Sequence, residues 1–229
     1  MQWKQSARLL VAACVALVMT GCATAPPFDY AVYKASRPRS ILVLPPLNST
    51  PEVYAPYSVL SQATFPLAES GYYVLPVSLV TETFRENGMT QPAEMHGAST
   101  DKLRQIFGAD AALYVNISKY GTAFQVVNSV TVVTAEAKLV DLKTGQQLWK
   151  GSASASSEEG QNNQQQGGLA GLLIAAIVKQ VIASTTDQSH KIAGMTANRL
   201  MSAGQKNGLL YGPRSPNYGK DGPGLRSDR

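Results

Sequence analysis

The residues whose types and spacing most clearly indicate chemistry are Met19, Thr20, Gly21 and Cys22. The two small residues before the cysteine let the chain enter a peptidase site in an extended form. The Cys22 thiol can be diacylated before cleavage between Gly21 and Cys22, and the freed amine can then be acylated too. Each buried methylene contributes about 0.8 kcal/mol, so several acyl chains hold a protein stably on a membrane. We therefore predict lipidation at Cys22 by diacylglycerol and fatty acid, and we expect no other cofactor.

Residues 1–21 have the three parts of a secretory signal. Lys4 and Arg8 make a positive start, residues 9–19 are a short apolar run, and small residues follow. That run is shorter than the roughly 20 apolar residues that a membrane span needs. Residues 19–22 resemble the bacterial lipobox, with methionine where leucine is most usual. Ala23 stands where an aspartate commonly marks inner-membrane retention, so we expect an outer-membrane protein whose domain faces the periplasm.

Catalytic and metal-binding patterns are weak in the rest of the chain. Cys14 lies in the signal, so the mature chain has no cysteine for a disulfide or a thiolate metal site. His96 and His190 are far apart in sequence and are read as surface or helix-face residues. Glu82 and Glu86 can share one helix face, which we interpret as a solvated surface rather than an acid–base pair. We predict no catalytic residue and no metal site.

Nucleotide and nucleic-acid binding are also disfavoured. The glycines at 167–171 open an apolar segment but lack the Lys-Ser/Thr of a phosphate loop. The serines at 152–157 show no nucleophile elbow. Two of the 20 basic residues lie in the signal, which leaves 18 against 15 acidic residues and a net charge of +3. That charge is too small to indicate a nucleic-acid partner.

The remaining chain is long enough for one domain with a hydrophobic core. Residues 22–39 contain Pro26, Pro27 and Pro38 and little periodicity, which predicts a lipidated tether. Residues 40–203 are predicted to form the domain, with a mobile loop at 156–168 that is rich in Gln, Asn and Gly. Residues 204–229 are Gly/Pro-rich and basic, which predicts a disordered tail. Deleting residues 212–229 should then leave the melting temperature nearly unchanged.

Alternating and helical spacings predict a single mixed β-sheet with flanking helices. Strands are expected at 40–44, 72–75, 113–118, 133–139 and 148–155, with a hairpin at 141–146 where Gly145 can take a positive φ. Helices are expected at 57–67, 78–86, 100–107 and 190–203, the first kinked or restarted at Pro66, whereas 89–98 reads as a polar loop. Alternation should send one of Tyr72 and Tyr73 inward and the other outward.

The segment 169–182 carries more apolar residues than one helix stripe against a sheet requires. Leu169 and Leu172 would sit at the edge of that stripe, and Gly168 and Gly171 would let a partner backbone approach closely. We predict that these four residues form an interaction surface. The alternative is that the helix only covers the sheet.

Three segments resemble a family of small Gram-negative lipoproteins, the GNA-type lipoproteins. They are Pro45-Pro46-Leu47-Asn48, residues 66–77 (PLAESGYYVLPV) and residues 107–114 (FGADAALY). The likeness spans about 40–203 and implies an α/β (α+β) fold similar to the TolB N-terminal domain, CsgG and LpoB. The hairpin at 139–145 with Trp149 looks like the matching hairpin in those proteins. The resemblance also implies an envelope protein partner, of which a CsgG-like lipoprotein is the candidate.

These observations favour an outer-membrane lipoprotein that acts without catalysis as a binding or accessory subunit of a cell-envelope assembly. Two alternatives stay open. One is an enzyme acting on peptidoglycan or another envelope polymer, which would release products from cell-wall sacculi. The other is a homo-oligomeric ring subunit, which light scattering would separate from a monomeric adaptor.

Overall fold

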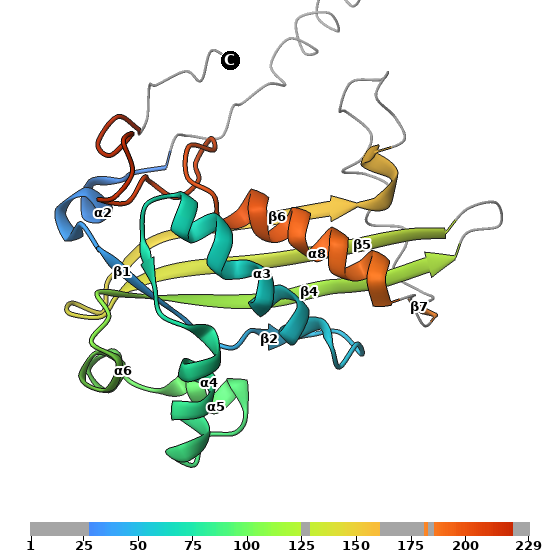
Figure 1. Cartoon of the computed structure of the whole chain (residues 1–229), viewed down its shortest axis with the longest axis horizontal. Coiled ribbons are helices and arrows are strands. Elements are labelled where there is room, and N and C mark those ends of the chain that lie inside the picture. Colours follow the sequence, from blue (N-terminus) through green and yellow to red (C-terminus); the bar gives the residue numbers. More distant parts are fainter. Residues whose placement is uncertain (1–27, 125–128, 161–180, 183–185, 222–229) are drawn as a thin grey trace, which may run out of the picture.

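A seven-stranded mixed sheet with the main strand order β3-β1-β4-β5-β6 forms the centre of the protein (Figure 1). The structure is a computed structural model that describes residues 28–124, 129–160, 181–182 and 186–221. The strands are β1 (Ser40–Val43), β2 (Leu47–Asn48), β3 (Tyr73–Val74), β4 (Ala111–Phe124), β5 (Ser129–Asp141), β6 (Gln147–Ser156) and β7 (Val181–Ile182). β1 pairs in parallel with β3 and β4, whereas β4, β5 and β6 form an antiparallel meander. The predicted α/β (α+β) class with one mixed sheet is confirmed.

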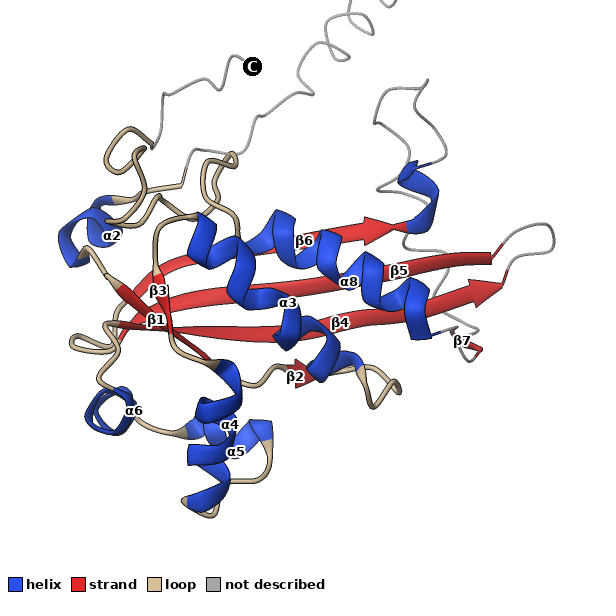
Figure 2. Ribbon diagram, in the orientation of Figure 1, coloured by secondary structure: helices blue, strands red, loops and turns tan. Residues whose placement is uncertain are grey.

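Helices cover the two faces of the sheet unequally (Figure 2). One face packs against α2 (Ala31–Ser36), α3 (Ala55–Glu69) and α8 (Thr186–Met201). The other packs against α4 (Val77–Glu86), α5 (Pro92–Gly97) and α6 (Thr100–Phe107) at one end only. A 3-10 turn, η1 (Ser157–Gly160), follows β6. Because strand side chains alternate, Ile41 and Val43 enter the first core whereas Leu42 and Leu44 enter the second.

The helix boundaries mostly follow the predicted spacing. α3 is continuous through Pro66, so the helix does not restart there; Pro66 lies in its last turn, and its missing N–H removes one helical hydrogen bond. The N-cap of α6 is Ser99, and its side chain accepts from the Lys102 N–H at 3.3 Å. Gly108 ends α6 with φ +64°, and Gly145 takes φ +70° in the hairpin as predicted. Tyr72 is buried and Tyr73 is exposed, as the alternation required.

The prediction of a polar loop at 89–98 is wrong, because α5 forms there. Pro92 stands at the start of the helix, where its missing N–H costs nothing. Glu94 reaches back to accept from the backbone N–H groups of Thr90 and Gln91, both at 3.3 Å. Met95 is buried against the second core, which holds α5 against the sheet.

The predicted tether at 22–39 is wrong for residues 28–39, which belong to the domain. Tyr30, the N-cap of α2, and Tyr33, within α2, are both buried in the first core. Arg39 and Ser40 donate their backbone N–H groups to the Asp110 carboxylate at 2.9 and 3.1 Å. Pro38 follows the α2 C-cap Arg37, so it comes after an element rather than preventing one. Residues 1–27, which include the predicted cleavage site between Gly21 and Cys22, lie outside the described residues.

The prediction of a disordered tail is wrong for residues 204–221, which dock on the first core. Leu209 is 1% exposed and Leu210 is 8% exposed. The Gly212 N–H donates to the Ser70 carbonyl at 2.8 Å, in a close approach between Gly212 and Gly71. Gly71 has φ +94°, and a Cβ there would collide with the backbone of Ser215. Glycine is therefore required where these two segments meet.

Three aromatic side chains hold this C-terminal segment by its carbonyl groups. The Trp149 indole donates to Asn207 O at 2.8 Å, and the Tyr30 hydroxyl donates to Gly208 O at 2.6 Å. The Tyr72 hydroxyl donates to Leu210 O at 2.6 Å. Because its one proton is used there, Tyr72 must accept from the Tyr33 hydroxyl, 2.8 Å away. The segment is fixed by buried hydrogen bonds that its own composition does not reveal.

The apolar segment 169–182 is only partly described. Val181 and Ile182 form β7, which pairs antiparallel with β4, so the predicted helix does not run through them. The part of the predicted mobile loop at 156–160 belongs to β6 and η1. Among the described residues, no helix has the length and apolar character to cross a membrane.

Candidate functional site

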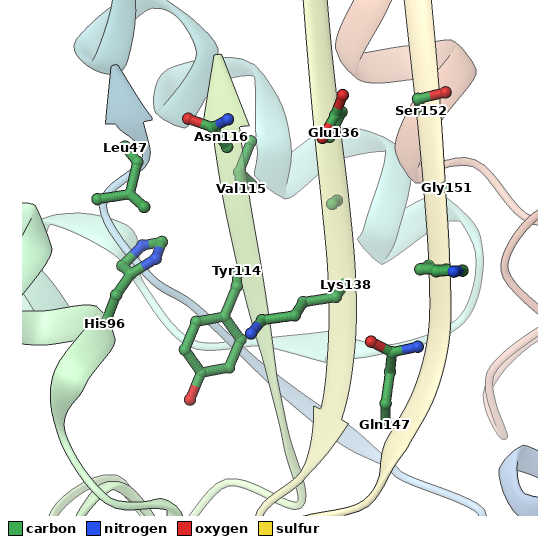
Figure 3. Close-up of a pocket in the computed structure, with 12 residues that line it drawn as sticks. Leu47, His96, Tyr114, Val115, Asn116, Glu136, Lys138, Gln147, Gly151 and Ser152 are labelled. Carbon is green, nitrogen blue, oxygen red and sulfur yellow. The ribbon is translucent and has the colours of Figure 1, made fainter. Parts of the chain in front are cut away.

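A groove lies on the sheet face opposite α3 and α8, beside α5 (Figure 3). Its volume is about 620 Å³. We call it the open-face groove; it is lined by Leu47, His96, Tyr114, Val115, Asn116, Glu136, Ala137, Lys138, Gln147, Lys150, Gly151 and Ser152. Its floor is made by β4, β5 and β6, and α5 and β2 form one wall. The long antiparallel ladder therefore gives the groove a rigid base.

Two rows of side chains cross the floor of the groove. The strand register pairs Tyr114 with Lys138, and Lys138 with Lys150. The next row along the same face pairs Asn116 with Glu136, and Glu136 with Ser152. Residues directly opposite each other on antiparallel strands have Cβ atoms about 4.5–5.5 Å apart. The groove thus presents a fixed array of polar groups rather than side chains on a loop.

The two lysines form a like-charged pair across the strands. Lys138 Nζ lies 4.9 Å from the Tyr114 ring centroid, where the ring face attracts a cation. Both lysines are exposed, and among the described residues neither makes an ion pair. Like charges directly opposite each other destabilise a sheet. The pair therefore leaves positive charge in the groove that an anionic ligand would neutralise.

His96 is held in one orientation at the wall. Its Nε2 lies 2.9 Å from Pro45 O, and since a carbonyl only accepts, Nε2 carries the proton. The ring meets Tyr114 edge-on, with centroids 5.2 Å apart. Burial lowers the pKa of His96; the Pro45 hydrogen bond raises it by less, and the charge of Lys138 adds the smallest effect, a further lowering. His96 is therefore neutral at neutral pH, and its unprotonated Nδ1 is a hydrogen-bond acceptor.

Tyr114 stays protonated, because burial raises the pKa of its hydroxyl. With neutral His96, two lysines and Glu136, the groove carries a net charge of +1 at neutral pH. Its hydroxyl and amide groups can both donate and accept hydrogen bonds. This array suits recognition of an anionic group that also carries polar atoms.

The groove shows no assembled nucleophile and base among its described residues. The one hydrogen bond described for His96 goes to a backbone carbonyl, not to a serine or a carboxylate. A serine–histidine contact does occur elsewhere, where Ser58 Oγ lies 2.8 Å from His190 Nδ1. Gln62 Nε2 lies 2.8 Å from the other nitrogen of that ring. Ser58 is buried between α3 and α8, so this contact joins two helices.

The groove was not among the sequence-predicted sites. The predicted interaction residues Gly168, Leu169, Gly171 and Leu172 lie outside the described residues, so that prediction stays a prediction. His96 and His190 lie on α5 and α8, and within the described ranges no cluster of three or more His, Cys, Asp or Glu side chains could hold a metal ion. The polar alternation of β5 and its hairpin with β6 were predicted, but the register that sets Lys138 opposite Lys150 was not.

Known proteins show where this chain belongs. The family model described as "Putative lipoprotein GNA1162-like" matches residues 28–214. This chain is a member of that family. The match includes α2 and most of the docked C-terminal segment, which agrees with the domain boundaries in the structure.

Two relatives come from Neisseria meningitidis. The "Putative lipoprotein NMB1124/NMB1162" of a serogroup B strain is 45% identical over 208 residues, which cover 90% of this chain and 95% of that protein. The crystal structure of lipoprotein GNA1162 is 48% identical, covers 62% of this chain and 96% of that chain, and has a TM-score of 0.51. The LpoB C-terminal domain from Escherichia coli aligns at 18% identity over 52% of this chain and 83% of that chain, with a TM-score of 0.36. The family model and the two Neisseria relatives confirm the predicted family.

Proposed function

We propose that this chain is an outer-membrane lipoprotein, anchored by acyl chains on Cys22, whose domain faces the periplasm. In this proposal it acts without catalysis, as a binding subunit of a cell-envelope assembly. Membership of a lipoprotein family supports the anchor. The segment at 19–22 supplies the acylation chemistry, and Ala23 favours the outer membrane.

The open-face groove is the proposed binding site, and the paired lysines carry the proposal. Lys138 and Lys150 stand opposite each other on rigid strands without an ion pair among the described residues. A carboxylate placed between them would relieve their repulsion and could also accept from Ser152 or Asn116. We propose that the ligand is a carboxylate-bearing segment of another envelope protein. The resemblance to the GNA-type lipoproteins makes a CsgG-like lipoprotein the first candidate.

Site-specific photocrosslinking in living cells tests this proposal. A photoreactive amino acid is placed at Ser152 or Gln147, both exposed in the groove, and at Glu86 on α4 as a matched exposed control. We expect a discrete crosslinked partner at the two groove positions and none at Glu86. The double substitution Lys138→Gln with Lys150→Gln should remove the crosslink while the protein still accumulates.

Three outcomes would change this assignment. Equal crosslinking at Glu86 and at the groove positions would contradict the groove as the site. A crosslinked partner that proves to be a second copy of this chain would favour the homo-oligomer, with light scattering of the purified protein as the check. Release of products from cell-wall sacculi by the purified mature protein would contradict the non-enzymatic role.

A further inference from the structure

The first described residue limits how far the domain can stand from its anchor. Phe28 follows Cys22 by six residues in the sequence. A chain spans at most about 3.6 Å per residue, so the acylated cysteine lies within about 22 Å of Phe28. The part of the domain around Phe28 must therefore lie near the bilayer. This step rests on the anchor in the proposed function.

Residues 28–39 and 204–221 together form the end of the molecule that holds Phe28; we call it the anchor end. The Phe28 N–H donates to Asn207 Oδ1 at 3.2 Å, and the Phe28 ring packs edge-on against Tyr30 with centroids 5.0 Å apart. Tyr30 in turn donates to Gly208 O. Figure 1 shows α2 and the red C-terminal segment side by side at this end. The two segments are thus one surface, although they are far apart in sequence.

Charge is distributed unevenly between the anchor end and the rest of the domain. The anchor end carries six basic residues and two acidic ones, a net charge of +4: Lys34, Arg37, Arg39, Lys206, Arg214 and Lys220 against Asp29 and Asp221. The other described residues carry nine basic and twelve acidic residues, a net charge of −3. The domain is therefore electrically polar, with its positive end where the lipid anchor leaves the chain.

The side chains of the anchor end are arranged for contact with a charged surface. All six basic residues are exposed. The two acidic residues each accept a backbone hydrogen bond, Asp29 from the Ala31 N–H and Asp221 from the Tyr211 N–H. Lys34 and Arg37 line a cavity of about 310 Å³ together with Tyr218, a partly exposed ring. Exposed tyrosine beside lysine and arginine is the composition found at membrane–water interfaces.

We propose that the anchor end is a membrane-contact surface that binds the head groups of anionic phospholipids. An anionic leaflet attracts basic side chains that lie within a Debye length of it, about 10 Å at 0.1 M salt. The short connection to Cys22 keeps these residues near the head groups. The contact sets the orientation of the domain, so that the acyl chains give attachment and the basic surface gives alignment.

Lysine reactivity in reconstituted vesicles tests this proposal. The lipidated protein is placed in phosphatidylcholine vesicles with or without roughly 30 mol% phosphatidylglycerol, and the acylation rate of each lysine is followed by mass spectrometry. We expect Lys34, Lys206 and Lys220 to react roughly threefold or more slowly in the anionic vesicles. About 1 M NaCl, which shortens the Debye length to about 3 Å, should remove the difference. Lys102 on α6 and Lys191 on α8 are exposed internal controls whose rates should not change.

A charge-reversal pair sharpens the test. In anionic vesicles, Lys206 should lose its protection from acylation when Lys34→Glu and Lys220→Glu are combined. The control combines Lys102→Glu with Lys191→Glu, which changes the charge by the same amount elsewhere on the domain. In that control Lys206 should stay protected. Equal rates at Lys34 and Lys220 in the two kinds of vesicle, or equal slowing at the control lysines, would overturn the proposal. The effect of salt is measured on the unmodified protein, so this part of the test does not depend on a variant. Flotation with neutral vesicles reports the acyl anchor separately, so a failed anchor and a failed basic surface give different results.

Discussion

At the scale of single residues, the open-face groove keeps a charge arrangement that a stable sheet would avoid. Lys138 and Lys150 are directly opposite, and such a pair is unfavourable by roughly 0.2–1 kcal/mol relative to a neutral pair. Lys150→Glu would replace repulsion by attraction. We expect this change to raise the free energy of unfolding by a few tenths of a kcal/mol and to abolish crosslinking from Ser152.

The measurement for that prediction pairs urea unfolding midpoints with crosslink yield. Lys102→Glu, an exposed change on α6, is the matched control and should leave the crosslink intact. A stabilised variant that loses its partner would show that the lysine pair serves binding rather than folding. A Lys150→Glu protein that still crosslinks fully would exclude the pair as the recognition element.

His96 should make stability depend on pH in one direction. Burial holds the pKa of His96 below its ordinary value, so the unfolded chain binds a proton that the folded chain does not. Stability should therefore be full above the ordinary histidine value, about pH 6.5, and should fall as the pH drops below it. His96→Gln, whose amide can still donate to Pro45 O, should flatten that fall. Urea unfolding midpoints measured between about pH 5 and 7.5 give the loss of stability for both proteins. If stability falls as steeply with pH in the His96→Gln protein, His96 is not the group responsible.

Cys22 could be singled out from the sequence alone, whereas the pairing of Lys138 with Lys150 could not. The acylation signal is local, because its residues are adjacent in the chain. Lys138 and Lys150 become neighbours only through the register of the hairpin, which shifts between Leu139 and Val140. A one-residue error in that register would place the two lysines on different faces. The hairpin could be predicted, whereas the site it builds could not.

At the scale of elements, the docked C-terminal segment should contribute strongly to stability. Deleting residues 204–229 would leave the hydroxyls of Tyr30 and Tyr72 and the indole of Trp149 without their carbonyl partners. Each unsatisfied buried donor costs about 1–3 kcal/mol, and the buried surface of Leu209 and Leu210 would be lost as well. We expect a loss of about 3 kcal/mol or more, a fall of about 6 °C or more in melting temperature.

Deleting residues 222–229 alone is the control, because it keeps every contact described for the segment. Thermal unfolding of the two truncations compares them directly. If the protein that lacks residues 204–229 melts within about 2 °C of the intact protein, residues 204–221 are not docked on the first core in solution.

The elements that escaped sequence analysis share a physical cause. Residues 204–221 offer few apolar side chains and are held mainly through backbone carbonyls, which every residue has. α2 is a six-residue helix with one buried residue, Tyr33, so it is too short to show a periodic apolar stripe. α5 could have been predicted from the sequence, since Pro92 followed by Glu94 is the start of a capped helix. β4, β5, β6 and α8 were predictable because their apolar periodicity extends over many residues, whereas the two-residue strands β2 and β7 were not predicted.

At the scale of the whole molecule, the two ends of the described chain close on each other. The segment after the predicted acylation site packs against residues 204–221, and the family model spans nearly the same range, 28–214. The domain is therefore larger on both sides than the predicted 40–203. With the proposed anchor at Cys22, the six-residue connection to Phe28 would hold the folded domain close to the membrane rather than on a long tether.

The acyl anchor and the folded domain should be separable, and Cys22→Ser tests this. Serine lacks the thiol that is acylated, so palmitate labelling should be lost and the protein should be unprocessed or released into the soluble periplasmic fraction. Each methylene removed from the bilayer costs about 0.8 kcal/mol, so no residual attachment of comparable strength remains. The contacts described for the domain all lie between residues 28 and 221, so any released protein should keep its melting temperature. Cys14→Ser changes the other cysteine, within the signal, and should keep both labelling and membrane location. Normal palmitate labelling of the Cys22→Ser protein, measured beside the Cys14→Ser control, would refute the anchor and with it the orientation we infer for the anchor end.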